Sequence, residues 1–342
     1  MSESETVSTQ LPADHSISIV VPVYQGERTL AGLMDEIKPL TSPQITTGGH
    51  SWVVGEVLLV NDNGPDNSAA VMRMLSKDFS FVRPVWLSRN FGQHAATLAG
   101  MASAGGDWVV TLDEDGQHDP SDIGALLDAA MERQSPVVYA KALNEAPHGF
   151  LRNSASKTAK WMLAKVSGTT NASEYSSFRL VLGNIARSVA AYAGSGVYLD
   201  VALGWVSNRI ATAPVTLREE GDRRSGYSPR RLFGHFLRMV LTSGTRALRA
   251  VAILGFIIGI IGIIFAIVVL IERVVGDIAI AGWASTVVIV LLSSGAILFS
   301  LGVVAEYIGI NVNMAMGKPP YLITTDPDNG PLGRPPRVTH GR

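Results

Sequence analysis

Two long stretches without a charged residue stand near the C-terminus of this 342-residue chain. They run from Val251 to Ile271 and from Ala284 to Ala305, and each reaches the ~20 residues that a helix needs to cross a bilayer. The alternative is a pair of buried helices in a soluble core, where uncharged runs of this length are unusual. The sequence therefore predicts two transmembrane helices, at about residues 251–271 and 284–305.

The charges beside these stretches predict how they lie in a membrane. Arginines precede the first stretch and Lys318 follows the second, whereas the connection at 272–283 carries a single basic residue. Because positive charge favours the cytoplasmic side, we expect a hairpin in the inner (cytoplasmic) membrane with both termini inside. Residues 1–15 are polar and acidic and do not resemble a secretory signal, so we expect a disordered tail and a cytoplasmic domain after it.

Residues 16–140 alternate between short β-branched runs and stretches with helical spacing. Strands are predicted at 17–23, 56–60, 82–87, 108–112 and 137–140, and helices at 27–40, 67–77, 92–104 and 121–133. This alternation predicts an α/β fold, in which a mostly parallel sheet carries helices on both faces. We assign residues 16–220 to this domain.

The segment that joins the domain to the first apolar stretch is basic and amphipathic. Residues 221–250 are predicted to form juxtamembrane helices, either on the bilayer surface or packed against the domain. Residues 306–342 form a cytoplasmic tail, and its Pro- and Gly-rich part after Tyr321 is expected to be flexible. The net charge of -1 gives no signal for nucleic-acid binding, and the lack of cysteine excludes disulfides and thiolate catalysis.

An acidic turn follows the fourth predicted strand. Asp113 and Asp115 are two residues apart, and Gln117 follows. Carboxylates at this spacing can converge on one divalent cation, and Mg²⁺ and Mn²⁺ prefer carboxylate and phosphate oxygens. Acidic turns are common, but here neighbouring strands also end in polar residues, which favours a functional site. We predict Asp113, Asp115 and Gln117 as ligands of a cation that neutralises a leaving diphosphate.

Polar residues after the first three strands are candidate contacts for a nucleotide. Asp62 follows the second strand and is placed to accept from a base or ribose, the alternative being an Asx turn closed by Gly64. Arg89 follows the third strand and is suited to a phosphate, whereas His94 is interpreted as structural. The predicted nucleotide contacts are Pro22, Tyr24, Glu27, Asp62, Arg89 and Asp113.

Four segments together resemble the second family of inverting glycosyltransferases. They are Val-Pro-Val-Tyr at 21–24, Val-Asn-Asp at 60–62, Leu-Ser-Arg-Asn-Phe-Gly at 87–92 and Leu-Asp-Glu-Asp-Gly-Gln-His at 112–118. More narrowly, the chain is similar to the polyprenyl-phosphate glycosyltransferases, the dolichol-phosphate-mannose synthase and GtrB-type group. Further matches are Ser-Phe-Arg-Leu at 177–180, Tyr-Leu-Asp at 198–200, Arg-Ser-Gly-Tyr-Ser at 224–228, Glu-Tyr-Ile-Gly at 306–309 and Lys-Pro-Pro-Tyr at 318–321.

The resemblance implies a GT-A catalytic domain with a divalent-metal site. It also implies catalytic and lipid-binding residues beyond the acidic turn. Glu174 stands where the family usually has Asp, and Glu114 replaces a small residue within the acidic triplet. The implied catalytic residues are Asp115, Glu174, Asp200 and Arg224. The implied contacts to lipid phosphate are Arg218, Arg223 and Arg224.

The activity that the resemblance implies is transfer of a sugar from a UDP- or GDP-linked donor to a polyisoprenyl phosphate, of the undecaprenyl or decaprenyl type, in cell-envelope glycan synthesis. One alternative is a hydroxyl-directed transferase, although the Gln-x-x-Arg-Trp motif usual in such enzymes is missing from the sequence. Another is a non-catalytic membrane protein with a degenerate domain. Gly255 and Gly259 stand at a spacing that allows close helix packing, within the hairpin or in a homo-oligomer.

Overall fold

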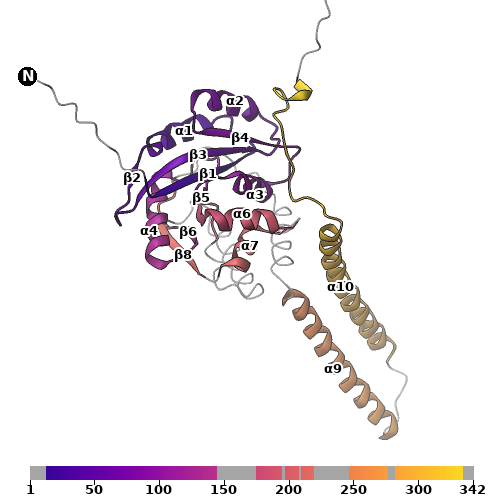
Figure 1. The fold of residues 1–342 in the computed structure, drawn as a ribbon. Coiled ribbons are helices and arrows are strands. Elements are labelled where there is room, and N and C mark those ends of the chain that lie inside the picture. Colours follow the sequence, from indigo (N-terminus) through magenta and orange to yellow (C-terminus); the bar gives the residue numbers. More distant parts are fainter. Residues whose placement is uncertain are drawn as a thin grey trace, which may run out of the picture. The chain divides into compact units, whose positions relative to one another are not determined.

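The computed structural model describes residues 13–144, 175–194, 197–207, 209–218, 246–275 and 282–333. These residues fall into two compact units. One unit holds the N-terminal α/β domain together with residues from Pro319 onward. The other holds the long helices α9 (Arg246–Val275) and α10 (Trp283–Ala315) (Figure 1).

Nine strands form one sheet in the described part of the first unit. They are β1 (His15–Val23), β2 (Gln44–Ile45), β3 (Ser51–Asn61), β4 (Val82–Leu87), β5 (Trp108–Thr111), β6 (Val137–Ala142), β7 (Arg179–Leu182), β8 (Ile210–Val215) and β9 (Ile323–Thr324). Their order is β8-β6-β7-β5-β1-β3-β4-β9, with β2 paired to β3. The central strands β5, β1, β3 and β4 are parallel, as the sequence predicts, whereas β7 and β9 run antiparallel to their neighbours.

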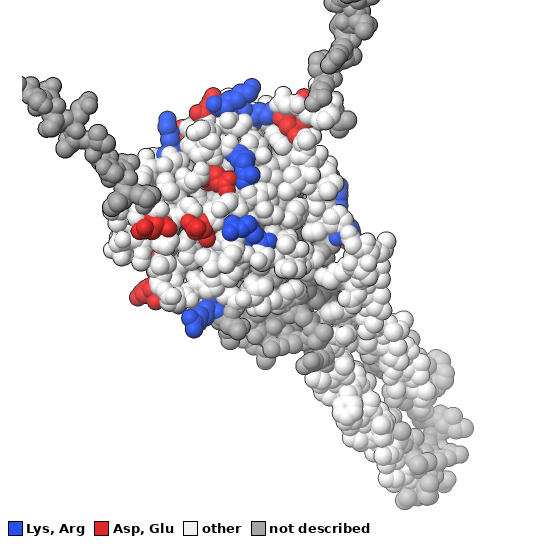
Figure 2. Space-filling view, viewed as in Figure 1, with Lys and Arg blue, Asp and Glu red and all other residues white. Residues whose placement is uncertain are grey.

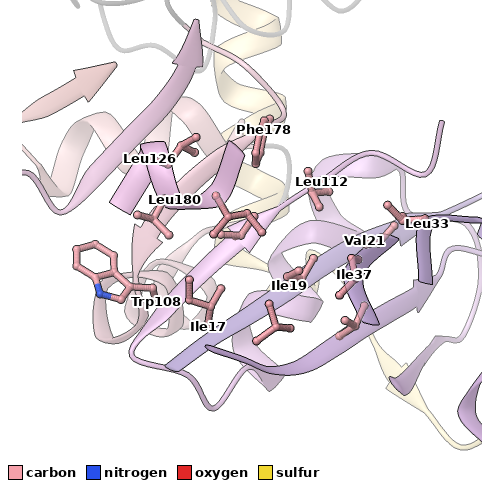
Figure 3. Close-up of a cluster of buried hydrophobic side chains, with 14 of the residues drawn as sticks. Ile17, Ile19, Val21, Leu33, Ile37, Trp108, Leu112, Leu126, Phe178 and Leu180 are labelled. Atoms are coloured by element: carbon pink, nitrogen blue, oxygen red, sulfur yellow. The ribbon is translucent and has the colours of Figure 1, made fainter. Parts of the chain in front are cut away.

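Helices cover both faces of the sheet, as predicted. On one face lie α1 (Leu30–Ile37), α2 (Ser68–Asp78) and α4 (Ile123–Arg133), and on the other α3 (Gln93–Ser103), α6 (Gly183–Tyr192) and α7 (Leu199–Val206). Short 3₁₀ helices occupy Lys38–Thr41, Pro120–Asp122 and Pro331–Gly333. Strand β1 is buried on both faces. Ile17 and Ile19 join one core (Figure 3), and Val20 joins the other.

The apolar stretches at the C-terminal end lie within α9 and α10, which contact each other. By length and composition, the part of α10 from Leu292 to Ala315 is able to cross a membrane, and its mean hydropathy is 1.7. In α9 the corresponding apolar stretch is shorter, from Val251 to Phe265. On the face shown, the described side chains of these helices are uncharged (Figure 2). Among the described residues, then, one helix meets the criterion for a span, and the predicted pair is not confirmed.

The C-terminal tail differs from the flexible segment that its composition predicts. Residues 319–333 belong to the α/β unit, where β9 pairs with β4 at the edge of the sheet. Helix α10 also continues past Ala305, the predicted end of the second span, as far as Ala315. Proline and glycine are frequent in loops of any mobility, so composition alone did not reveal the strand pairing.

Candidate active site

The predicted site residues gather because four parallel strands end at one edge of the sheet. Strand β7 enters beside them from the opposite direction, and its first residue, Arg179, pairs with Thr111 at the end of β5. Between these elements lies a cavity of about 140 Å³. Its lining comprises Pro22, Gln93, His94, Thr97, Thr111, Leu112, Asp113, Tyr175, Ser176, Ser177, Arg179 and Asp200.

The acidic turn places Asp113 in the wall of this cavity, with Asp115 close enough to interact with it electrostatically. Gly116 adopts a φ of +74°, which turns the chain sharply, and the Gln117 N–H donates to the Asp115 carboxylate at 3.1 Å. Asp113 lines the cavity and accepts from the side-chain amide of Gln93 at 2.5 Å. Burial raises the pKa of Asp113, and the negative charge of Asp115 raises it further.

The donor set of this turn fits a divalent cation that is shared with a substrate. In the described residues no three His, Cys, Asp or Glu side chains come close enough to hold a metal alone. Mg²⁺ is commonly bound by one or two carboxylates plus substrate phosphates. Asp113 and Asp115 would provide the carboxylates, and a bound substrate would provide the phosphates. After burial, the charge of Asp115 also contributes to the raised pKa of Asp113, and a cation bound between the two carboxylates would offset that repulsion.

Glu114, between the two carboxylates, connects the acidic turn to the loop after β1. Its two carboxylate oxygens accept from the N–H groups of Tyr24 and Gln25, each at 2.9 Å. A Cβ on Gly26 would lie 2.8 Å from Glu114 Oε2, so the approach requires glycine. The loop that carries Tyr24 and the turn that carries Asp113 are therefore held together. Sequence reasoning noted Glu114 only as an unusual residue and did not predict this contact.

Asp62 is buried and is engaged by the loop after β4. One carboxylate oxygen accepts from the Phe91 N–H at 2.7 Å and the other from the Gly92 N–H at 2.8 Å. Burial raises the pKa of Asp62, although these two amides and Arg89 act in the opposite direction. An Asx turn forms one residue earlier than the alternative considered from the sequence: Asn61 accepts from the N–H of Asn63 at 2.9 Å, whereas the Asp62 oxygens bind Phe91 and Gly92. Asp62 thus shapes residues 88–92, which we call the β4–α3 loop.

The other predicted nucleotide contacts lie around the same strand ends. Pro22 lines the cavity, and the side chain of Tyr24, two residues later in the chain, is exposed. The Arg89 guanidinium lies 4.1 Å from the centre of the Phe91 ring. Glu27 accepts from the Asn67 N–H at 3.2 Å, which fixes the loop after β1 to the start of α2.

Asp200 lies in the first turn of α7 and forms a buried cluster that sequence reasoning only partly found. It pairs with Arg179 Nη1 and accepts from the Tyr139 hydroxyl at 2.9 Å. Tyr139, Arg179 and Thr111 are neighbours across adjacent strands, so the sheet register assembles the cluster. The available signal was Arg179 itself, a charge inside the apolar run 178–182.

Two histidines also belong to the site. His94, interpreted from the sequence as structural, lines the cavity with its ring 4.4 Å from that of Tyr198. His118 is buried with its ring 5.1 Å from that of Phe178. Burial lowers the pKa of His118, which favours its neutral form.

The residues implied for lipid phosphate divide into two groups. Arg218 is described, and its guanidinium is paired with Glu36 at 2.8 Å and with Asp119 at 2.7 Å. Its N–H also donates to the carbonyl of Gln117 at 3.0 Å, so Arg218 supports the acidic turn. The other two, Arg223 and Arg224, lie outside the described residues, and so does Glu174, which the resemblance implies as a catalytic residue.

Comparisons with known proteins agree with this geometry. The family described as glycosyl transferase family 2 matches residues 18–182. The chain is similar to undecaprenyl-phosphate 4-deoxy-4-formamido-L-arabinose transferases. The protein of Edwardsiella ictaluri is 26% identical over 90% of this chain and 93% of the relative. That of Yersinia enterocolitica is 28% identical over 94% and 95%.

A solved structure supports the fold. Glucosyl-3-phosphoglycerate synthase from Mycobacterium tuberculosis, in complex with Mn²⁺, UDP-glucose and phosphoglyceric acid, covers 68% of this chain and 80% of its own. Its TM-score is 0.50 and its sequence identity 18%. The predicted α/β architecture of the GT-A type is thereby confirmed. The strand-end motifs and the acidic turn lie within residues 18–182, the part of the chain that matches glycosyl transferase family 2, and the chain as a whole is similar to undecaprenyl-phosphate sugar transferases.

Proposed function

We propose that this protein transfers a sugar from a nucleotide-diphosphate sugar to a polyisoprenyl phosphate at the cytoplasmic face of the membrane, with inversion at the anomeric carbon. One observation carries the proposal. The similarity to undecaprenyl-phosphate transferases extends over about nine-tenths of both chains, so it includes the region of α9 and α10 as well as the α/β domain. A soluble transferase acting on a soluble acceptor has no need of that region.

The donor would bind across the ends of β1, β3, β4 and β5. The exposed Tyr24 and the loop held by Asp62 would contact the nucleoside, and Arg89 would face its phosphates. Glu114 accepts from the backbone N–H groups of Tyr24 and Gln25 in the loop between β1 and α1. The residues that contact the nucleoside and those that contact the diphosphate would therefore be held in one fixed arrangement. Such fixed positioning lowers the barrier by pre-organising the reacting groups.

Asp113, Asp115 and Gln117 would hold a divalent cation, Mg²⁺ or Mn²⁺. When bound, the cation would offset the negative charge that develops on the departing diphosphate. The Mn²⁺ and UDP-glucose bound by the synthase of similar fold support this assignment. Arg218 would support the same turn, because its guanidinium pairs with Asp119 and its backbone N–H donates to the carbonyl of Gln117.

The acceptor is already reactive at neutral pH. A phosphate monoester has a second pKa near ~6, so a lipid phosphate oxygen is largely ionised at pH 7 without a strong general base. We propose Arg223 and Arg224 as its ligands, with Glu174 nearby, and Asp200 on the wall of the cavity. The ion pair with Arg179 fixes the position and charge of Asp200. Catalysis then rests on orientation and charge stabilisation.

The membrane arrangement is part of the proposal. Helices α9 and α10 would cross the inner membrane as a hairpin, with the catalytic domain and both termini in the cytoplasm. The glycines at 255 and 259 permit close packing within the hairpin or in a homo-oligomer.

A transfer assay with a donor panel tests this function. Detergent-purified protein is incubated with UDP- and GDP-linked sugars, including 4-deoxy-4-formamido-L-arabinose, and with undecaprenyl or decaprenyl phosphate, with and without Mn²⁺ or Mg²⁺. We expect a metal-dependent glycosyl-phosphoryl lipid from one class of donor. No product from any donor with folded protein would contradict the proposal.

A further inference from the structure

The segment after α10 is attached to the catalytic domain at several points. We call residues 319–333 the C-terminal strap. Strand β9 of the strap pairs with β4, with Thr324 opposite Trp86 and Ile323 opposite Leu87. The Ser88 N–H donates to the carbonyl of Leu322 at 3.0 Å. The strap therefore covers the edge of β4, a strand that would otherwise expose unpaired backbone groups.

An ion-pair cluster holds the strap more firmly than a two-residue strand can. The guanidinium of Arg73, on α2, donates to both carboxylate oxygens of Asp326, with Nη2 2.7 Å from Oδ1 and Nε 2.9 Å from Oδ2. It also pairs with Asp328 and lies 4.8 Å from the centre of the Trp86 ring. The pairing with Arg73 lowers the pKa of Asp326 to about 2. Bidentate contacts of this kind fix geometry as well as adding energy.

The strap ends its pairing where the β4–α3 loop begins. Ser88, whose N–H donates to the carbonyl of Leu322, is also the first residue of that loop. The same stretch is bonded on its other side by the strand-end residues of β3. Asn63 Nδ2 donates to the Leu87 carbonyl at 2.7 Å, and Asp62 accepts from the N–H groups of Phe91 and Gly92. The loop is thus held between the strap and Asp62.

We propose that the C-terminal strap positions the β4–α3 loop for donor binding, with Arg73 and Asp326 as positioning residues that do not touch the substrate. The proposal rests on the proposed function, because it assumes that this loop contacts the nucleotide sugar. Along the chain, residues 316–318 alone connect α10 to the strap. The segment that follows the predicted second span would then act directly on donor affinity.

Two variants and one matched control test the proposal. Each of the variants Arg73→Gln and Asp326→Asn removes the charge of one partner and so breaks the ion pair. Arg83→Gln is the control, because Arg83 lies on β4, the strand that the strap pairs with, but forms its ion pair with Glu56 at 2.9 Å and not with the strap. Hydrogen exchange is measured for peptides covering residues 86–92, and KM is measured separately for the nucleotide sugar and for the lipid phosphate.

Both positioning variants should exchange faster at residues 88–92 than wild type and the control. Their KM for the nucleotide sugar should rise about fivefold, the size of a partly exposed ion pair with good geometry, while KM for the lipid phosphate stays within about twofold. A general loss of structure would instead speed exchange across the sheet and raise both KM values. Unchanged exchange at residues 88–92 in both variants would overturn the proposal.

The exchange measurement also separates this inference from the proposed function. If wild type transfers no sugar to any lipid phosphate, the proposed function fails, but exchange in residues 88–92 still reports on the strap. If wild type is active and the two variants match it in donor KM, the role of the strap in donor binding is refuted while the function stands.

Discussion

The buried ion pair between Arg179 and Asp200 allows a quantitative test of how the site is assembled. The two residues are 5% and 8% exposed, and the Tyr139 hydroxyl donates to the same Asp200 oxygen at 2.9 Å. Removing one partner of a buried pair leaves an uncompensated charge and costs about 3–5 kcal/mol. For a domain of this size, Arg179→Met should therefore lower the melting temperature by roughly 6–20 °C.

Removing both charges should cost less than removing one. Apolar replacement of a whole buried pair is often neutral, so Arg179→Met with Asp200→Leu is expected to melt above either single variant. The Tyr139 hydroxyl then lacks its acceptor, at a cost of about 1–3 kcal/mol, which a third change, Tyr139→Phe, should largely recover. Turnover should be lost in every variant that lacks Asp200, whatever its stability.

Thermal unfolding of the purified protein in detergent, followed by tryptophan fluorescence, provides the assay. Arg83→Gln is the matched control, because the Arg83 side chain is half exposed and its ion pair with Glu56 should contribute no more than about 1 kcal/mol to stability. The reasoning would be refuted if the double variant melted no higher than the two single variants, since the pair would then not behave as buried charges.

Three further predictions concern the acidic turn and the strap. Asp115→Asn should reduce turnover about a thousandfold, the equivalent of about 4 kcal/mol of charge stabilisation, with a melting temperature close to that of wild type; near-normal turnover would exclude the metal role. Arg218→Gln should raise the Mn²⁺ concentration needed for half-maximal activity, and Glu36→Gln should do so more weakly; an unchanged metal requirement in both would show that Arg218 does not support the turn. The ion pair of Asp326 with Arg73, which holds the pKa of Asp326 near 2 against an ordinary 3.8, should stabilise the protein by about 2 kcal/mol above pH 4 and lose this effect as the pH falls toward 2. The melting temperatures of wild type and Asp326→Asn should therefore differ at pH 7 and converge in acid, and a constant difference would contradict this assignment.

Much of the fold and the location of the site could be predicted because they depend on local pattern. Apolar β-branched runs such as 17–23 are recognisable as buried strands, and the ends of parallel strands gather at one edge. Pro22 and Asp113 line the cavity at that edge for this reason, and Asp115 follows Asp113 on the same turn. The antiparallel orientation of β7 in the sheet was not predictable, because a long segment of sequence separates β7 from β6, its neighbour in the sheet.

The contacts that organise the site were harder to predict because they join residues far apart in sequence. Glu114 binds the backbone at Tyr24, and Arg218 pairs with Glu36, and neither pairing leaves a local pattern. For Arg218 the resemblance implied a contact to lipid phosphate, and in the structure its guanidinium is paired with Glu36 and Asp119. The strap was missed because two residues are too few for a strand to be recognised from alternation.

The central claim is that a lipid phosphate oxygen receives the sugar. The most direct measurement compares undecaprenyl phosphate with undecaprenol as acceptor for the preferred donor, with Mn²⁺ present, and identifies the product by mass spectrometry and its anomeric configuration by NMR. We expect a phosphodiester-linked sugar of inverted configuration from the phosphate alone, and no product from the alcohol. Transfer to the alcohol, or a product with retained configuration, would contradict it.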